Sequence, residues 1–146
     1  MHGEISQNRT QMQYKSDRNL AAAQRIIDGN DETYCFASVH CSYYAVLQFM
    51  KYLLANVKAN PISYVEQDAY SDSDSHEKIL KEIRNRMGQN PKIEKSFLQS
   101  FNQLRRQRKL ADYTKQRFTV LECIEIRDTA NRLIKNLTSY FNNKIA

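Results

Sequence analysis

The stretch ETYCFASVHCSYYAVLQFMKYLLAN occupies residues 32–56 and decides the fold of this chain. It carries no formal charge between Glu32 and Lys51, and its apolar residues are not confined to one stripe of a helix. A helix that is apolar nearly all round either spans a membrane or lies at the centre of a bundle. Polar side chains such as Ser38 and Gln48 interrupt the apolar run, which a membrane span would not favour. The sequence therefore predicts the central helix of a bundle.

The overall composition also favours helices. The chain has 146 residues, enough for one domain, and its three glycines and two prolines leave few turns. Its three cysteines, Cys35, Cys41 and Cys123, are typical of buried reduced thiols. No charged-then-apolar signal segment begins the sequence, so we expect a cytoplasmic protein. We also expect no cofactor.

Cap and breaker residues locate the other helices. Residues 1–16 read as a polar N-terminal extension, after which Ser16 or Asp17 would cap a first helix that Gly29 ends. Residues 57–75 read as one long irregular surface loop. Its acidic run, residues 71–75, lacks the glycine and the final glutamate of a helix-loop-helix calcium site, so we expect no metal there.

Three further helix starts follow that loop. Asp74 with Glu77 resembles a capping pair, Asn90 precedes a proline that suits a first helical position, and Thr119 with Glu122 forms a capping box. The predicted fold is therefore all-α, an antiparallel up-and-down bundle of four to five helices within residues 17–146.

The positive charge is concentrated in one part of the chain. The formal net charge is +6, and residues 77–117 contain twelve Lys or Arg against four Asp or Glu. Such a basic segment favours an anionic partner, of which nucleic acid is the commonest. The alternative is that these charges only solvate the outer faces of the helices.

One arginine interrupts an apolar row in the predicted fourth helix. Ile93, Phe97, Phe101 and Leu104 recur at helical spacing, and the next member of the series is Arg108. A buried guanidinium needs partners. In one interpretation Arg108 pairs with Asp112, one turn further on, and closes the bundle. In the other, Arg108 lines a cleft and binds phosphate with the help of Arg105, Arg106 and Lys109.

Two segments resemble a known family. Residues 41–48, CSYYAVLQ, followed by Leu53 and Leu54, resemble the second-helix signature of HEPN-domain proteins. Residues 104–113, LRRQRKLADY, resemble the arginine–alanine–aspartate–tyrosine signature near the end of their fourth helix. The likeness covers about residues 17–142. It implies a helical up-and-down bundle, usually a homodimer. Many members are metal-independent RNases, often toxins paired with a small nucleotidyltransferase antitoxin.

The resemblance also implies roles for particular residues. In active members an arginine steadies the phosphate and a histidine a few residues later handles the proton of the ribose 2′-hydroxyl. Arg108 matches the arginine, but Asp112 or Tyr113 stands in the place of the histidine, and none of the three histidines of the chain lies in the motif. A tyrosine with an ordinary pKa near 10 is a poor base, and an aspartate paired with arginine is a weakened one. Whether the chain is an enzyme therefore stays open.

Geometry adds a condition to this site. Arg108 and Tyr113 lie about 140° apart around an ideal helix, so we expect them to share a cleft only if the helix bends or ends between them. From the second helix, Tyr43 and Tyr44 are candidates for stacking on bases, although their spacing is equally typical of a core. His40 is a further candidate, because Cys41 beside it stands where many relatives carry an arginine.

Three functions remain as alternatives. The first is a homodimer that binds RNA or a nucleotide through Arg105, Arg106, Arg108 and Lys109. The second is a metal-independent RNase toxin with a non-histidine base, for which Arg108, Asp112 and Tyr113 are the candidates. The third is a non-catalytic protein-interaction module. The expected partners are a second copy, RNA or a nucleotide, and a nucleotidyltransferase-type antitoxin, with no membrane and no metal.

Overall fold

The computed structural model describes residues 2–71 and 74–146, with side chains from residue 11 onward. The elements of this part of the chain are α1 (His2–Asp28), the 3-10 turn η1 (Glu32–Tyr34), α2 (Cys35–Asn56), α3 (Tyr64–Asp68), α4 (Ser75–Arg86), α5 (Pro91–Tyr113) and α6 (Val120–Phe141). A single antiparallel bridge joins Val57 to Ile145. The predicted all-α bundle is confirmed, and the short helix α3 adds to the five helices expected.

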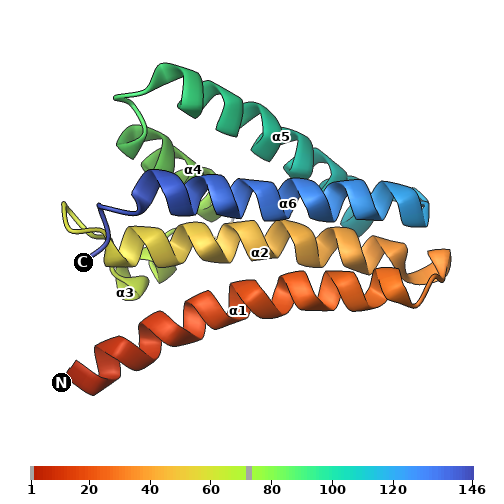
Figure 1. Cartoon of the computed structure of the whole chain (residues 1–146), viewed down its shortest axis with the longest axis horizontal. Coiled ribbons are helices and arrows are strands. Elements are labelled where there is room, and N and C mark those ends of the chain that lie inside the picture. Colours follow the sequence, from red (N-terminus) through yellow and green to blue (C-terminus); the bar gives the residue numbers. More distant parts are fainter. Residues whose placement is uncertain (1, 72–73) are drawn as a thin grey trace.

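The uncharged stretch forms the central helix, α2, as predicted. It packs against α1, α4, α5 and α6, and Figure 1 shows it lying between α1 and α6. The short connection after Gly29 makes α1 and α2 antiparallel, and α5 and α6 are antiparallel for the same reason (Figure 1). None of the described helices combines the length and the hydropathy that crossing a bilayer requires.

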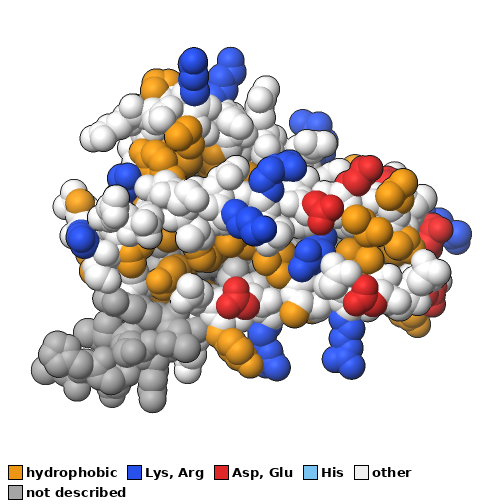
Figure 2. Space-filling model, in the orientation of Figure 1, with side chains coloured by type: hydrophobic (Ala, Val, Ile, Leu, Met, Phe, Trp, Pro, Cys, Tyr) orange, Lys and Arg blue, Asp and Glu red, His pale blue; other side chains and the backbone are white. Residues whose placement is uncertain are grey.

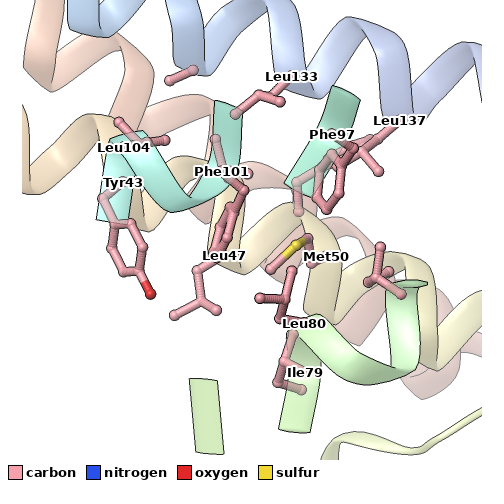
Figure 3. Packing of buried hydrophobic residues seen from close by; sticks show 14 of the residues in the cluster. Tyr43, Leu47, Met50, Ile79, Leu80, Phe97, Phe101, Leu104, Leu133 and Leu137 are labelled. Atoms are coloured by element: carbon pink, nitrogen blue, oxygen red, sulfur yellow. The ribbon is translucent and has the colours of Figure 1, made fainter. Parts of the chain in front are cut away.

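The core gathers apolar side chains from four helices around α2 (Figure 3). Met50 of α2 lies near Leu80 of α4, while Phe97 and Phe101 of α5 stack with ring centroids 5.9 Å apart. Tyr43 lies at the edge of this cluster, 5.6 Å from the Phe101 ring, and its hydroxyl points away from the other core residues. Tyr43 therefore marks the boundary between the apolar core and the polar side chains next to it.

Two of the predicted caps are formed. The Asn90 side chain accepts a hydrogen bond from the Ile93 backbone nitrogen at 3.3 Å, ahead of a proline at the first helical position. Thr119 and Glu122 each accept from the other's backbone nitrogen, at 3.1 and 3.2 Å, in a complete capping box. The starts of α5 and α6 are therefore set by local sequence.

Of the other two predicted helix starts, the one at Ser16 or Asp17 is wrong, and the one at Asp74 is right but lacks its capping contact. α1 runs through Ser16 without a break, and the buried Ser16 hydroxyl donates to the Ala45 carbonyl oxygen at 2.7 Å, so it joins α1 to α2. Asp74 is the N-cap residue of α4, but its side chain makes no capping hydrogen bond. Glu77 forms an ion pair with Arg105 of α5, which draws its carboxylate away from the start of its own helix.

The stretch predicted as one irregular loop, residues 57–75, contains α3. Ser63 caps this helix by accepting from the Glu66 backbone nitrogen at 3.1 Å. The buried side chain of Gln67 donates to the carbonyl oxygens of Lys51 and Ile62 at 3.0 and 2.9 Å, which ties the segment to α2. Residues 72 and 73 of the acidic run lie outside the described residues.

Candidate functional site

The buried row of α5 continues through an arginine, as the sequence predicted. Its buried members are Phe97, Phe101, Leu104, Arg108 and Ala111. Ile93, expected at the start of the row, is 39% exposed, because this end of α5 diverges from α6 (Figure 1). Arg108 itself is only 6% exposed. Removing a guanidinium from water is costly, so the partners of Arg108 decide what it does.

Three tyrosine rings surround the guanidinium of Arg108. Its carbon Cζ lies 4.7 Å from the ring centroid of Tyr43, 5.5 Å from that of Tyr44 and 5.7 Å from that of Tyr113. Cations within about 6 Å of an aromatic ring are attracted by its quadrupole. Tyr43 and Tyr44, the two stacking candidates on α2, therefore lie at Arg108.

The polar contacts of Arg108 are all long. Its Nη1 atom lies 3.3 Å from the Tyr113 hydroxyl and 3.5 Å from a carboxylate oxygen of Asp112, and its Nη2 atom lies 3.4 Å from Nδ1 of His76. Its Nε atom has no partner among the described residues. A charge-assisted hydrogen bond is normally about 2.7–2.9 Å long. The protein therefore holds this cation by its rings more than by tight hydrogen bonds.

The carboxylate of Asp112 has a closer partner than Arg108. Both of its oxygens lie 2.9 Å from Nδ1 of His40 on α2. The His40 ring also packs on Tyr44, with centroids 4.6 Å apart, and its side chain is 46% exposed. Because a carboxylate can only accept, Nδ1 carries the ring proton and Nε2 is the nitrogen left for other partners.

His76, in the first turn of α4, is the second histidine at this site. Its Nδ1 atom lies 2.9 Å from the Tyr43 hydroxyl as well as 3.4 Å from Arg108. Burial, followed by the positive charge of Arg108, lowers the pKa of His76 to about 4, so the ring is neutral at pH 7. Arginine can only donate, so Nδ1 accepts. Burial raises the pKa of Tyr43, and its protonated hydroxyl donates to the same nitrogen.

The structure thus brings two histidines to an arginine whose sequence motif contains none. His76 precedes Arg108 by 32 residues and His40 precedes Asp112 by 72. His76 is the residue that sequence reasoning missed, and no local pattern around it signals the contact. The expectation that Tyr113 meets Arg108 only across a bent or ended helix is also wrong. α5 is continuous through Tyr113, and the two long side chains bridge the angle between them.

The other basic candidates separate into two groups. Arg105 lies beside the cluster and pairs with Glu77, and Lys109 is exposed on the next turn. Both positive charges help to keep His76 neutral. Arg106 is exposed and lies about 160° around the helix from Arg108, so the fold does not bring it to the cluster.

Cys41 contributes no charge to this site. Its thiol is partly buried, and burial followed by the negative charge of Asp112 raises its pKa. The thiol therefore stays protonated at neutral pH. Positive charge at this site comes instead from Arg108 and, beside it, from Arg105 and Lys109 of α5.

The cluster around Arg108 consists of Arg108, Asp112 and Tyr113 of α5, His40, Tyr43 and Tyr44 of α2, and His76 of α4. Among the residues that the structure describes, no group of three or more His, Cys, Asp or Glu side chains could hold a metal ion. The cluster supplies a fixed cation, a neutral ring that accepts from it, and an exposed imidazole aligned by a carboxylate. These groups suit a phosphodiester ligand.

Comparison of the chain with protein-family models, with curated proteins and with solved structures found no match.

Proposed function

We propose that this chain is a HEPN-like helical-bundle protein that binds RNA through the cluster around Arg108. The observation that carries the proposal is a buried guanidinium whose contacts with Tyr113, His76 and Asp112 are 3.3 Å or longer. A phosphate oxygen would provide the shorter charge-assisted contact that the protein does not. Tyr113 is 76% exposed and lies against Arg108, so rotation of this one side chain would open the guanidinium to a ligand.

The surroundings of Arg108 support an RNA ligand over an isolated anion. Tyr44 and the exposed His40 ring lie in tilted contact, with their planes 36° apart, and offer an aromatic surface for an unpaired base. Lys109 adds an exposed positive charge on the same helix, which favours approach of a polyanion.

A matched pair of variants tests the binding proposal. Arg108→Met and Arg106→Met remove the same charge from the same helix, two residues apart, but only Arg108 lies in the cluster. We expect Arg108→Met to weaken binding of a fluorescent single-stranded RNA at least tenfold, measured by anisotropy, and Arg106→Met to change it less than threefold. Affinity of the wild type should fall steeply with salt. Equal losses in the two variants would place any binding outside the cluster, and no RNA affinity in the wild type would favour the interaction module.

Metal-independent RNA cleavage is the second candidate function, and the His40–Asp112 contact favours it. Nε2 of His40 would take the proton from a ribose 2′-hydroxyl, whose oxygen then attacks the adjacent phosphorus. Arg108 would stabilise the negative charge that develops on the phosphate oxygens. The bond to the 5′-oxygen breaks, that oxygen takes a proton from water, and a 2′,3′-cyclic phosphate remains. His40 would thus supply the base that the motif lacks.

Cleavage is tested by incubating RNA with the protein in the presence of EDTA. We expect His40→Gln to lower the single-turnover cleavage rate at saturating RNA by at least a hundredfold, so that any affinity lost with the ring does not enter the measured rate. An oligonucleotide with 2′-deoxyribose at the cut site should resist cleavage. Cleavage that persists in His40→Gln would exclude His40 as the base, whereas binding without cleavage would leave the first proposal alone.

The homodimer and the nucleotidyltransferase-type antitoxin belong to the same proposal, because the HEPN resemblance implies both. Sedimentation equilibrium of the purified chain measures the first. Co-purification with a small nucleotidyltransferase encoded beside it measures the second. A monomer at all accessible concentrations would remove the dimer from the proposal.

A further inference from the structure

A second surface feature lies at the opposite end of α5 from Arg108. The N-terminal half of α5 diverges from α6 (Figure 1), and a groove of about 730 Å³ opens between the two helices. Its floor consists of Phe97 on α5 and of Leu133 and Leu137 on α6, with Ile93 exposed at the opening. Figure 2 shows hydrophobic side chains at the surface between α5 and α6. We call this feature the α5–α6 groove.

The charge around the α5–α6 groove has one sign. Among the described residues that line it, Lys92 and Arg132 are the charged ones, and none is Asp or Glu. Within residues 11–71 and 74–146, neither cation forms an ion pair. The remaining wall positions are mainly Ser and Asn side chains. An occupant that matches this surface is apolar where it meets the floor and negatively charged at its edges.

The dimensions suit a short helix. The α5 residues that line the groove run from Lys92 to Ser100, which is about 12 Å along a helix axis. This length corresponds to two turns of an amphipathic helix, whose apolar residues at every third or fourth position would enter the groove. An apolar floor offers nothing to phosphates, so the groove does not suit nucleic acid.

We propose that the α5–α6 groove docks an amphipathic helix of a partner polypeptide, with leucine-like residues on one face and Asp or Glu along its edges. The groove supplies the affinity by removing the exposed Ile93 and the partly exposed Tyr140 from water, and Lys92 and Arg132 select the acidic edges. This surface is separate from the cluster around Arg108, so the inference holds whether or not the chain binds RNA.

Two labelled helical peptides test the proposal on the full chain. Both have leucines at helical spacing, and their edge positions are all Glu in one and all Lys in the other. We expect the Glu peptide to bind at least tenfold more tightly in fluorescence anisotropy. Lys92→Glu combined with Arg132→Glu should reverse this preference. Equal affinity for the two peptides, or no affinity for either, would overturn the proposal.

A second experiment fills the α5–α6 groove with a large side chain and measures the affinity for the Glu peptide. Ser100 lines the groove, and Ser100→Trp should lower affinity for the Glu peptide at least tenfold. Gln99 is exposed next to it and does not line the groove, so Gln99→Trp should leave affinity unchanged. Unchanged binding by Ser100→Trp would also overturn the proposal. If sedimentation shows a dimer of the chain that Ser100→Trp dissociates, the occupant is a second copy and the proposal of a separate partner is wrong.

Discussion

Replacing Arg108 with methionine should leave the protein about as stable while it weakens RNA binding. Methionine fills a similar elongated volume and needs no hydrogen-bond partner. Asp112 does not lose its last partner in this variant, because His40 Nδ1 remains 2.9 Å from both carboxylate oxygens. The substitution therefore removes a buried charge while Asp112 keeps a hydrogen-bond donor. A buried charge left with no partner is the usual reason that breaking an ion pair destabilises a protein.

The expected change can be bounded from the contacts of Arg108. Replacing a whole buried ion pair by apolar groups stabilises proteins by about 1–4 kcal/mol in favourable cases, and here only one of the two charges is removed. Arg108 also gives up contacts with three tyrosine rings, each worth about 0.5–1 kcal/mol even at an exposed site and so about 1.5–3 kcal/mol together. The two effects are of similar size, so we expect the free energy of unfolding to change by less than about 1 kcal/mol, or the melting temperature by less than about 2–4 °C.

Urea denaturation followed by circular dichroism measures this difference. Arg106→Met is the control, since exposed Arg106 should change stability by less than about 0.5 kcal/mol. A loss of more than about 1 kcal/mol in Arg108→Met would refute the reasoning. Arg108 would then be the residue that closes the bundle with Asp112, and the long contacts would no longer argue for a ligand.

Two further predictions concern pH and capping. In the unfolded chain His76 takes up a proton near pH 6.5, but in the fold only near pH 4, so the fold loses stability as the pH drops from about 6.5 towards 4. His76→Gln should lack this loss of stability. Melting temperatures measured by calorimetry between pH 7 and 4.5 check this, and an equal fall in wild type and variant would contradict the prediction. Thr119→Ala should cost about 1 kcal/mol in urea denaturation by removing the capping box of α6. Thr138→Ala is the control, because exposed Thr138 bonds only within its own helix and should cost less than about 0.5 kcal/mol; an equal effect in both would argue against the cap.

Helix ends were predictable where the signal was local and no other partner competed for it. Asn90 and Thr119 cap their helices because their nearest donors belong to the same turn. Ser16 and Glu77 carried similar signals but bond to α2 and α5, since groups on neighbouring helices lie within reach. Where a tertiary partner replaced the local one, the predicted capping contact did not form, although α4 still begins after Asp74 as predicted.

The sequence by itself determined that residues 32–56 form the centre of a helical bundle and that Arg108 lies in a buried row. Both follow from the spacing of apolar and charged residues along one helix, which is a local property. Only the tertiary structure decided that His40 and His76 meet the α5 residues and that α5 diverges from α6. These contacts depend on how each helix is rotated about its axis and on where the segment between α2 and α4 places the start of α4. Both are set by how whole helix surfaces fit together, which no local sequence pattern specifies.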